Sequence, residues 1–419
     1  MEIATERVRN WTSGPLDLSW LRLTELPELP AGLAKLWCHN NLLTKLPETL
    51  PAGLLELHCY KNHLTTLPDT LPAGLRELHC YHNRLVSLPD TLPAGIRDLC
   101  CDHNQLTSLP DTLPAGLTQL YCFHNLLTRL PDTLPAGLII LNCYENQLTT
   151  LPETLPMGLL ELYCYENQLT RLPDTLPASL RSLQCANNRL TTLPEYLPAT
   201  LNRLLCGENH LATLPDTLPA GLTVLYCFDN RLTRLPETLP AGLTILNCDG
   251  NQLKTLPNTL PASLTQINCN GNLLSRLPET LPAGLTRLSC CDNQLTTLPD
   301  TLPAGLLSLH CYENQLTRLP DTLPADLQLF NCMSNRLTTL PQTLPISLSL
   351  TCSNNNFPDI EDDESIPDYV ARVNAFAEAA SRERIVARCA FYFEELAQKV
   401  WHPQRVERLM LAGVDMEEM

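Results

Sequence analysis

Leucines recur through most of the chain in a pattern of apolar and polar positions that repeats every 21 residues. A clean copy, residues 50–70, reads LPAGLLELHCYKNHLTTLPDT. Its Leu57 and Cys59 are two residues apart, so they point to the same side of a short extended strand. Self-similarity at a fixed period is the signature of a solenoid, in which each copy forms one turn. The pattern predicts a curved parallel sheet of stacked strands, with inward ladders of leucine and cysteine.

A cysteine occupies the same slot in successive copies, and an asparagine follows it three residues later every time. The cysteines of this row are Cys38, Cys59, Cys80, Cys101, Cys122, Cys143, Cys164, Cys185, Cys206, Cys227, Cys248, Cys269, Cys290, Cys311, Cys332 and Cys352. Neighbouring strands are about 4.8 Å apart, which exceeds the roughly 3.8 Å Cβ separation that a disulfide prefers. We therefore predict buried reduced thiols, which indicate a reducing compartment. The asparagines are expected to satisfy main-chain groups at the turn.

The other half of each copy, L-T-x-L-P-D-T-L-P-A-G-L, carries two prolines, and the chain contains 36 in all. Proline fixes φ, lacks a backbone donor and disfavours helix for the residue before it. The convex side is therefore predicted to be extended or polyproline-like rather than helical.

The repeat also sets the domain boundaries. Residues 1–15 are predicted to form an N-terminal helical cap that presents Ile3, Val8 and Trp11 to the first rung. Residues 16–357 are predicted to form the solenoid of about 17 repeats, and residues 358–366 an acidic linker. Residues 367–419 are predicted to form an α-helical C-terminal segment, in which Pro403 begins a last short helix. We expect these few helices to form a small cap folded back over the open edge of the sheet, with a separate partner-binding module as the alternative.

The formal net charge is −17, which argues against nucleic acid or an anionic membrane as the main partner. Much of the acid follows the L-P pair, in a convex row that Asn258 and Gln342 interrupt. Five arginines share the slot before L-P and are expected to neutralise that row: Arg129, Arg171, Arg234, Arg276 and Arg318. The charged N-terminus predicts no signal peptide, and no apolar stretch is long enough to span a membrane. These features predict a cytoplasmic protein.

Side chains that flank the ladder cysteines point out from the concave face, because neighbours on a strand alternate. In the first eight rungs these positions are rich in aromatic residues, which dominate interface hot spots. We predict a concave surface that binds a protein or peptide through Trp37, His39, His58, Tyr60, His79, Tyr81, Tyr121, Phe123, Tyr144, Tyr163 and Tyr165. The alternative is that the aromatic rings merely stack along the ladder and stiffen the sheet.

Two other constellations carry possible chemistry. His82, His103 and His124 share one slot on successive rungs, at a spacing that permits metal binding, although repeat copying alone produces such columns. Cys100 lies near His79, Asp98 and Asp102, which are the ingredients of nucleophilic catalysis. A shallow open sheet excludes no water and offers no oxyanion donors. We therefore expect no enzyme activity, no metal and no cofactor.

The string L-P-x-x-L-x-x-L-x-x-x-x-N-x-L-T-x-L-P resembles the short leucine-rich repeats of bacterial effectors, as in the YopM and IpaH families. The resemblance implies a leucine-rich repeat solenoid delivered into host cytoplasm. Some relatives carry a ubiquitin-ligase domain with a C-x-D motif, but this chain has too few residues after the repeats, and Cys389 is followed by Ala390. The cysteine-bearing repeats and the tail at 400–419 also look similar to repeat proteins of large DNA viruses.

The interpretation favoured by these features is a non-enzymatic protein-protein interaction module, effector-like or a scaffold, that uses its concave face. The alternative is a structural or assembly component, such as a virion protein, that packs through its convex or end surfaces. The pattern leaves the oligomeric state open.

Overall fold

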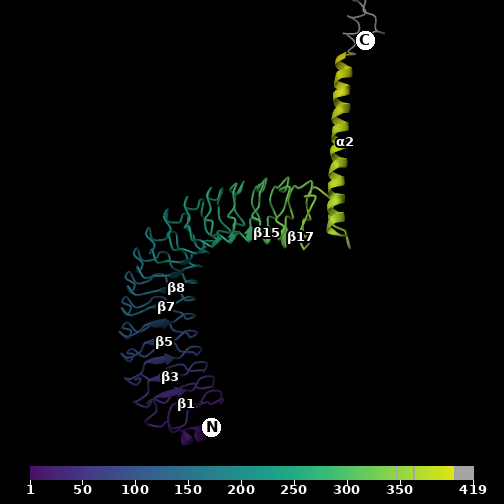
Figure 1. Ribbon diagram of the computed structural model, residues 1–419. Coiled ribbons are helices and arrows are strands. Elements are labelled where there is room, and N and C mark those ends of the chain that lie inside the picture. The colour runs from purple at the N-terminus through teal and green to yellow at the C-terminus, as the bar shows by residue number, and fades with distance from the viewer. Residues whose placement is uncertain (346, 362–363, 401–419) are drawn as a thin grey trace, which may run out of the picture.

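The computed structural model describes residues 1–345, 347–361 and 364–400. These residues form a curved solenoid whose single parallel sheet of 17 strands lies on the inner side of the curve (Figure 1). The strands are β1 Pro15–Asp17, β2 Lys35–Trp37, β3 Glu56–His58, β4 Glu77–His79, β5 Asp98–Cys100, β6 Gln119–Tyr121, β7 Ile140–Asn142, β8 Glu161–Tyr163, β9 Ser182–Gln184, β10 Arg203–Leu205, β11 Val224–Tyr226, β12 Ile245–Asn247, β13 Gln266–Asn268, β14 Arg287–Ser289, β15 Ser308–His310, β16 Leu329–Asn331 and β17 Ser349–Thr351. The predicted leucine-rich repeat solenoid with a concave parallel sheet is confirmed.

Each strand pairs with the next along the chain, in a register that places equivalent repeat positions side by side. Leu57 of β3 lies opposite Leu78 of β4, and His58 lies opposite His79. The central leucines and the ladder cysteines are buried in one continuous core, up to the last strand, where Leu350 is only partly buried. The register therefore converts each repeat position into a column of side chains that runs the length of the sheet.

All 19 cysteines are free, and 17 of them are buried. Burial raises the pKa of Cys59, Cys143 and Cys206 to about 12. The ladder thiols therefore stay protonated at neutral pH and act as small apolar side chains, as the sequence predicts.

Asparagines form a second ladder just beyond the strands. The side chain of Asn209 is typical: Nδ2 donates to the carbonyl oxygens of Cys185 (3.0 Å) and Cys206 (3.3 Å). Its Oδ1 accepts the N–H of Leu190 at 2.9 Å. One asparagine thus ties its own rung to the preceding one. It is the partner of the N–H of Leu190, and it shares the carbonyls of Cys185 and Cys206 with Asn188 and Asn230.

The convex side contains no helix in the described residues between 12 and 345, as the prolines predict. The residue before each ladder asparagine turns the chain with a positive φ, for example 50° at His82 and 50° at His103. The left-handed region is unfavourable for side chains larger than glycine. The ladder hydrogen bonds on both sides hold these residues there.

The N-terminal helix α1 (Glu2–Asn10) covers the first rung, as expected, but with different contacts. Ala4 is fully buried, and Val8 and Trp11 pack against the core, whereas Ile3 is 59% exposed. The expected contact of Ile3 was wrong, because the small Ala4 faces the rung and lets the helix backbone approach closely.

The C-terminal helix α2 (Ile366–Val400) caps the other end with its first turns alone. Tyr369, Val370 and Val373 are buried against the last rung, and beyond them the helix projects away from the solenoid (Figure 1). The prediction of several helices folded back over the edge was wrong up to Val400, because no glycine or proline interrupts residues 368–400. The helix that was expected from Pro403 lies outside the described residues. Within the part of the chain that the structure describes, no helix has the length and apolar character of a membrane span.

Candidate functional site

The inner face of the sheet presents three columns of side chains over strands β2 to β8. The first column, at the start of each strand, consists of Lys35, Glu56, Glu77, Asp98, Gln119, Ile140 and Glu161. The second column, at the end of each strand, consists of Trp37, His58, His79, Cys100, Tyr121, Asn142 and Tyr163. The third column follows the ladder cysteine and consists of His39, Tyr60, Tyr81, Asp102, Phe123, Tyr144 and Tyr165.

The aromatic residues of the third column form two stacked groups. His39 stacks on Tyr60 and Tyr60 on Tyr81, each with ring centroids 4.3 Å apart. Phe123, Tyr144 and Tyr165 continue beyond Asp102, with centroid separations of 4.4 and 4.2 Å. The stacking along the ladder that the alternative interpretation describes is therefore present. Because neighbouring ring faces cover one another, each half-buried ring meets solvent through its edge.

The second column brings the remaining predicted site residues to the same face. His58 stacks on His79 with a centroid separation of 4.4 Å, and Trp37 lies 6.0 Å from His58. The hydroxyls of Tyr121 and Tyr163 donate to the first-column Gln119 and Glu161. All eleven residues of the predicted binding surface thus lie on one continuous face, each partly exposed. Their role in binding stays a prediction.

Sequence reasoning overlooked the acidic part of this face. Glu56, Glu77 and Glu161 stand in the first column, two residues before the aromatic row, on the same side of each strand. Glu56 pairs with Lys35 at 2.7 Å, and Glu77 lies 3.7 Å from Nε2 of His58. The alternation that located the aromatic residues of the second and third columns predicts the acidic first column equally well.

Cys100 and two carboxylates interrupt the aromatic columns at β5. The thiol of Cys100 donates to Oδ1 of Asp98 at 3.4 Å, and Asp102 pairs with Nδ1 of His103 at 3.0 Å. Burial, together with the carboxylate of Asp98, raises the pKa of the Cys100 thiol far above its ordinary value. Catalysis by Cys100 would require a thiolate, and its neighbours here favour the protonated form.

Five buried polar side-chain atoms in the described residues have no hydrogen-bond partner: four belong to the second column, and the fifth is on Ser182, which begins the next strand, β9. They are Nε1 of Trp37, Nε2 of His58, Nε2 of His79, Oδ1 of Asn142 and Oγ of Ser182. Buried polar groups in native proteins are nearly always paired, so each exception asks for an explanation. All five atoms lie on the inner face of the sheet.

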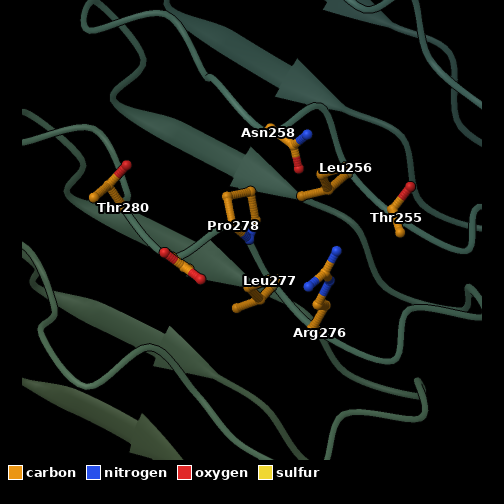
Figure 2. Close-up of a pocket in the computed structure, with 8 residues that line it drawn as sticks. Thr255, Leu256, Asn258, Arg276, Leu277, Pro278 and Thr280 are labelled. Atoms are coloured by element: carbon orange, nitrogen blue, oxygen red, sulfur yellow. The ribbon is translucent and has the colours of Figure 1, made fainter.

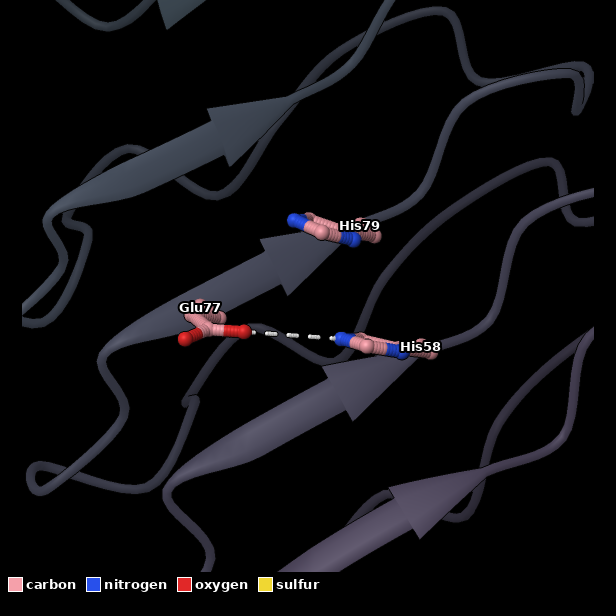
Figure 3. A group of neighbouring side chains, drawn as sticks. All are labelled: His58, Glu77 and His79. Carbon is pink, nitrogen blue, oxygen red and sulfur yellow. Dashed lines mark ion pairs between the residues drawn. The ribbon is translucent and has the colours of Figure 1, made fainter. Parts of the chain in front are cut away.

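The three histidines that the sequence places in one slot do form a column. The ring centroids of His82 and His103 lie 3.9 Å apart, and those of His103 and His124 lie 4.5 Å apart. However, Nδ1 of His103 is engaged by Asp102 and Nδ1 of His124 by Glu145. Among the described residues, two other groups place three possible metal ligands within 4.8 Å of one another. They are His58, Glu77 and His79, which Figure 3 shows, and His79, Asp98 and Cys100.

The outer surface contains a hollow where the regular ion pairing is broken. Four arginines of the row before L-P bind the carboxylate 18 residues earlier, in the pairs Arg129–Asp111, Arg171–Glu153, Arg234–Asp216 and Arg318–Asp300. The equivalent position for Arg276 is the uncharged Asn258, and both line the hollow in Figure 2. Exposed pairs of this kind contribute about 0–1 kcal/mol. We assign no site to this open surface.

The stability of the protein should depend on pH through His58. Burial and the neighbouring His79 lower the pKa of His58 to about 4, compared with about 6.5 in an unfolded chain. Between these values the unfolded chain binds more protons than the folded one, so stability is full above pH 6.5 and falls as the pH drops towards 4. Denaturant titrations at pH 7 and pH 4.5 should show a larger loss for the wild type than for His58→Asn, by roughly 1–3 kcal/mol. Equal losses would contradict a buried neutral imidazole.

Comparisons with known proteins agree on the fold. No protein-family model and no curated protein matches the chain. Among solved structures, the leucine-rich effector protein YopM from Yersinia pestis is 34% identical, covers 84% of this chain and 93% of its own, and has a TM-score of 0.64. The functional domain of InlJ from Listeria monocytogenes, which includes a cysteine ladder, is 25% identical over 74% of this chain and 64% of its own, with a TM-score of 0.63.

A third neighbour is the leucine-rich repeat structure of FLRT2, solved in an octameric complex with latrophilin 3 and Unc5D. It is 25% identical over 59% of this chain and 87% of its own, with a TM-score of 0.51. The repeat sequence, the 17-stranded parallel sheet and the identity to YopM across nearly all of that chain lead to one conclusion. The chain belongs to the leucine-rich repeat proteins.

Proposed function

We propose that this protein is a non-enzymatic interaction module that binds a protein or peptide on the inner face of its sheet. The observation that carries the proposal is the partly exposed aromatic surface over β2 to β8, which also concentrates the unpartnered buried polar atoms. The leucine-rich repeat neighbours are protein-interaction modules, and FLRT2 is solved within a complex of several proteins. An effector-like or scaffold role in a reducing cytosol fits the column of reduced thiols.

The chemistry of the face indicates the kind of segment it accepts. Because the rings are stacked, a partner meets their edges and the tyrosine hydroxyls rather than open ring faces. The carboxylates of Glu56, Glu77 and Glu161 line the same face, and the chain carries a formal net charge of −17. A basic segment with hydrogen-bonding side chains is complementary to this surface.

The test is affinity capture from cytosolic extract with the intact chain and with a variant in which four stacked tyrosines, Tyr60, Tyr81, Tyr144 and Tyr165, are replaced by alanine. A matched control replaces four tyrosines outside this surface: Tyr196, Tyr226, Tyr312 and Tyr392. A protein held by the wild type and the control, and lost by the first variant, supports the proposal, and the captured protein is then measured by titration. Removal of several central aromatic anchors should weaken binding by about 100-fold or more. Retention of every partner by the first variant would place the interaction elsewhere.

A further inference from the structure

Five side chains with metal-binding atoms meet where strands β3, β4 and β5 pair, at the middle of the aromatic surface. His58 and His79 come from the second column, Glu77 and Asp98 from the first, and Cys100 follows His79 in the second. Figure 3 shows the two imidazoles lying parallel on adjacent strands, with the carboxylate of Glu77 directed at His58. Residues far apart in the sequence thus converge through the strand register alone.

The distances within this cluster suit a small divalent ion. Nε2 of His79 lies 3.4 Å from Oδ2 of Asp98, and Oδ1 of Asp98 lies 3.4 Å from Sγ of Cys100. A tetrahedral zinc ion with its usual bond lengths separates its nitrogen, oxygen and sulfur ligands by about 3.3–3.6 Å. Nε2 of His58 and the carboxylate of Glu77 stand 3.7 Å apart on the other side of His79. The two groups share His79, which places His58 beside the set of His79, Asp98 and Cys100 as the candidate fourth ligand.

The unpartnered ring nitrogens supply an independent reason for a ligand at this place. Nε2 of His58 and Nε2 of His79 are buried without a hydrogen-bond partner, although a carboxylate lies near each. A buried nitrogen left in this state costs about 1–3 kcal/mol, which a metal bond would remove.

We propose that this cluster binds a divalent transition-metal ion of the zinc class, held by His79, Asp98 and Cys100 with His58 as the fourth ligand. Nitrogen, oxygen and sulfur donors together are the ligand set that zinc accepts, whereas magnesium and calcium prefer oxygen alone. The thiol of Cys100 donates to Oδ1 of Asp98. Binding breaks that S–H bond, forms a sulfur–zinc bond and releases one proton to solvent. The ion would bridge three neighbouring strands between the two stacked aromatic groups.

The experiment measures zinc binding to the full chain, freed of metal with a chelator and kept reduced. A Cys389→Ser background removes the exposed thiol of α2, which offers an unrelated site. Calorimetry with zinc chloride is expected to give one ion per chain, and repetition in buffers of different ionisation enthalpy should give about one proton released per ion. Cobalt in place of zinc should produce a sulfur-to-metal charge-transfer absorption.

Variants decide whether the ion occupies this cluster. His79→Asn and Cys100→Ser should each weaken binding about tenfold or more, and Cys100→Ser should abolish the charge-transfer absorption. His310→Asn is the matched control, because His310 occupies the second column on β15 and is hydrogen bonded to Ser308 at 3.0 Å. The proposal is overturned if the wild type retains no zinc, if His79→Asn and Cys100→Ser bind as well as the wild type, or if His103→Asn alone removes the ion. Neither the binding nor its loss depends on a protein partner, so failure here leaves the proposed function standing.

Discussion

Replacement of Asn209 by alanine is expected to lower the free energy of unfolding by about 3–5 kcal/mol. The side chain is 4% exposed and satisfies the N–H of Leu190 and the carbonyls of Cys185 and Cys206. Alanine leaves the buried N–H of Leu190 without a partner, which costs about 1–3 kcal/mol. The carbonyls of Cys185 and Cys206 each lose one of two asparagine donors and keep Asn188 and Asn230, and each lost hydrogen bond adds about 0.5–1.5 kcal/mol. The measurement is denaturant unfolding of the full chain, combined with hydrogen exchange of the rungs around β10.

A matched control uses another asparagine of the same repeat array. Asn258 is exposed on the convex side, so Asn258→Ala should change stability by less than about 0.5 kcal/mol. Asn209→Asp tests the donor specifically, since a carboxylate would face two carbonyl oxygens and should also be strongly destabilising. If Asn209→Ala were as mild as Asn258→Ala, the asparagine ladder would not be what holds successive turns together.

The second large effect is expected at the C-terminal cap, where Tyr369→Ala should destabilise the last rungs by about 3–5 kcal/mol. Tyr369 is fully buried, its hydroxyl donates to the carbonyl of Pro358 at 3.1 Å, and Sγ of Cys352 donates to it at 3.3 Å. Removal of the ring opens a cavity under α2 and exposes the edge strand β17. Amide exchange should accelerate in β16 and β17 and stay unchanged in β8, because each repeat contacts only its neighbours.

The same helix provides the control for this prediction. Tyr392 is 54% exposed on the projecting part of α2, so Tyr392→Ala should leave exchange in β17 unaltered. Sedimentation of Tyr369→Ala should also reveal concentration-dependent association, since an uncovered parallel edge pairs readily with another. Unchanged exchange in β17 after Tyr369→Ala would show that the first turns of α2 do not cap the solenoid.

Periodicity predicted most of the fold because each copy has the same pattern of leucine, cysteine, asparagine and proline, and so forms the same turn. The alternation around Cys59 was sufficient to place Tyr60 on the inner face and Leu57 in the core, and the prolines excluded helices from the convex side. The two ends lie outside that rule. Ala4 rather than Ile3 contacts the first rung, because that contact depends on packing against a single terminal rung. The unbroken α2 follows instead from the absence of glycine and proline in residues 368–400, which is already visible in the sequence.

The candidate site was predicted in part for the same reason. Alternation located the aromatic residues of the second and third columns, but the prediction did not extend to the carboxylates of Glu56 and Glu77 in the first column. Their meeting with His58 and His79 follows from strand register. The protonation state of Cys100 could not be predicted from register. It depends on burial and on the distance to Asp98, and the spacing of residues along the chain gives neither.

The uniform register has a consequence for how the molecule changes length. Between β2 and β16, each strand residue lies beside the residue 21 positions further along, as Leu57 lies beside Leu78. An unequal genetic crossover can delete or duplicate one whole copy. The rungs that it joins still place leucine beside leucine, cysteine beside cysteine and asparagine beside asparagine. The core survives such an event, whereas the sequence of side chains along the inner face is shortened or extended by one step. Copy number can therefore change the length of the inner face while the fold of each turn stays the same.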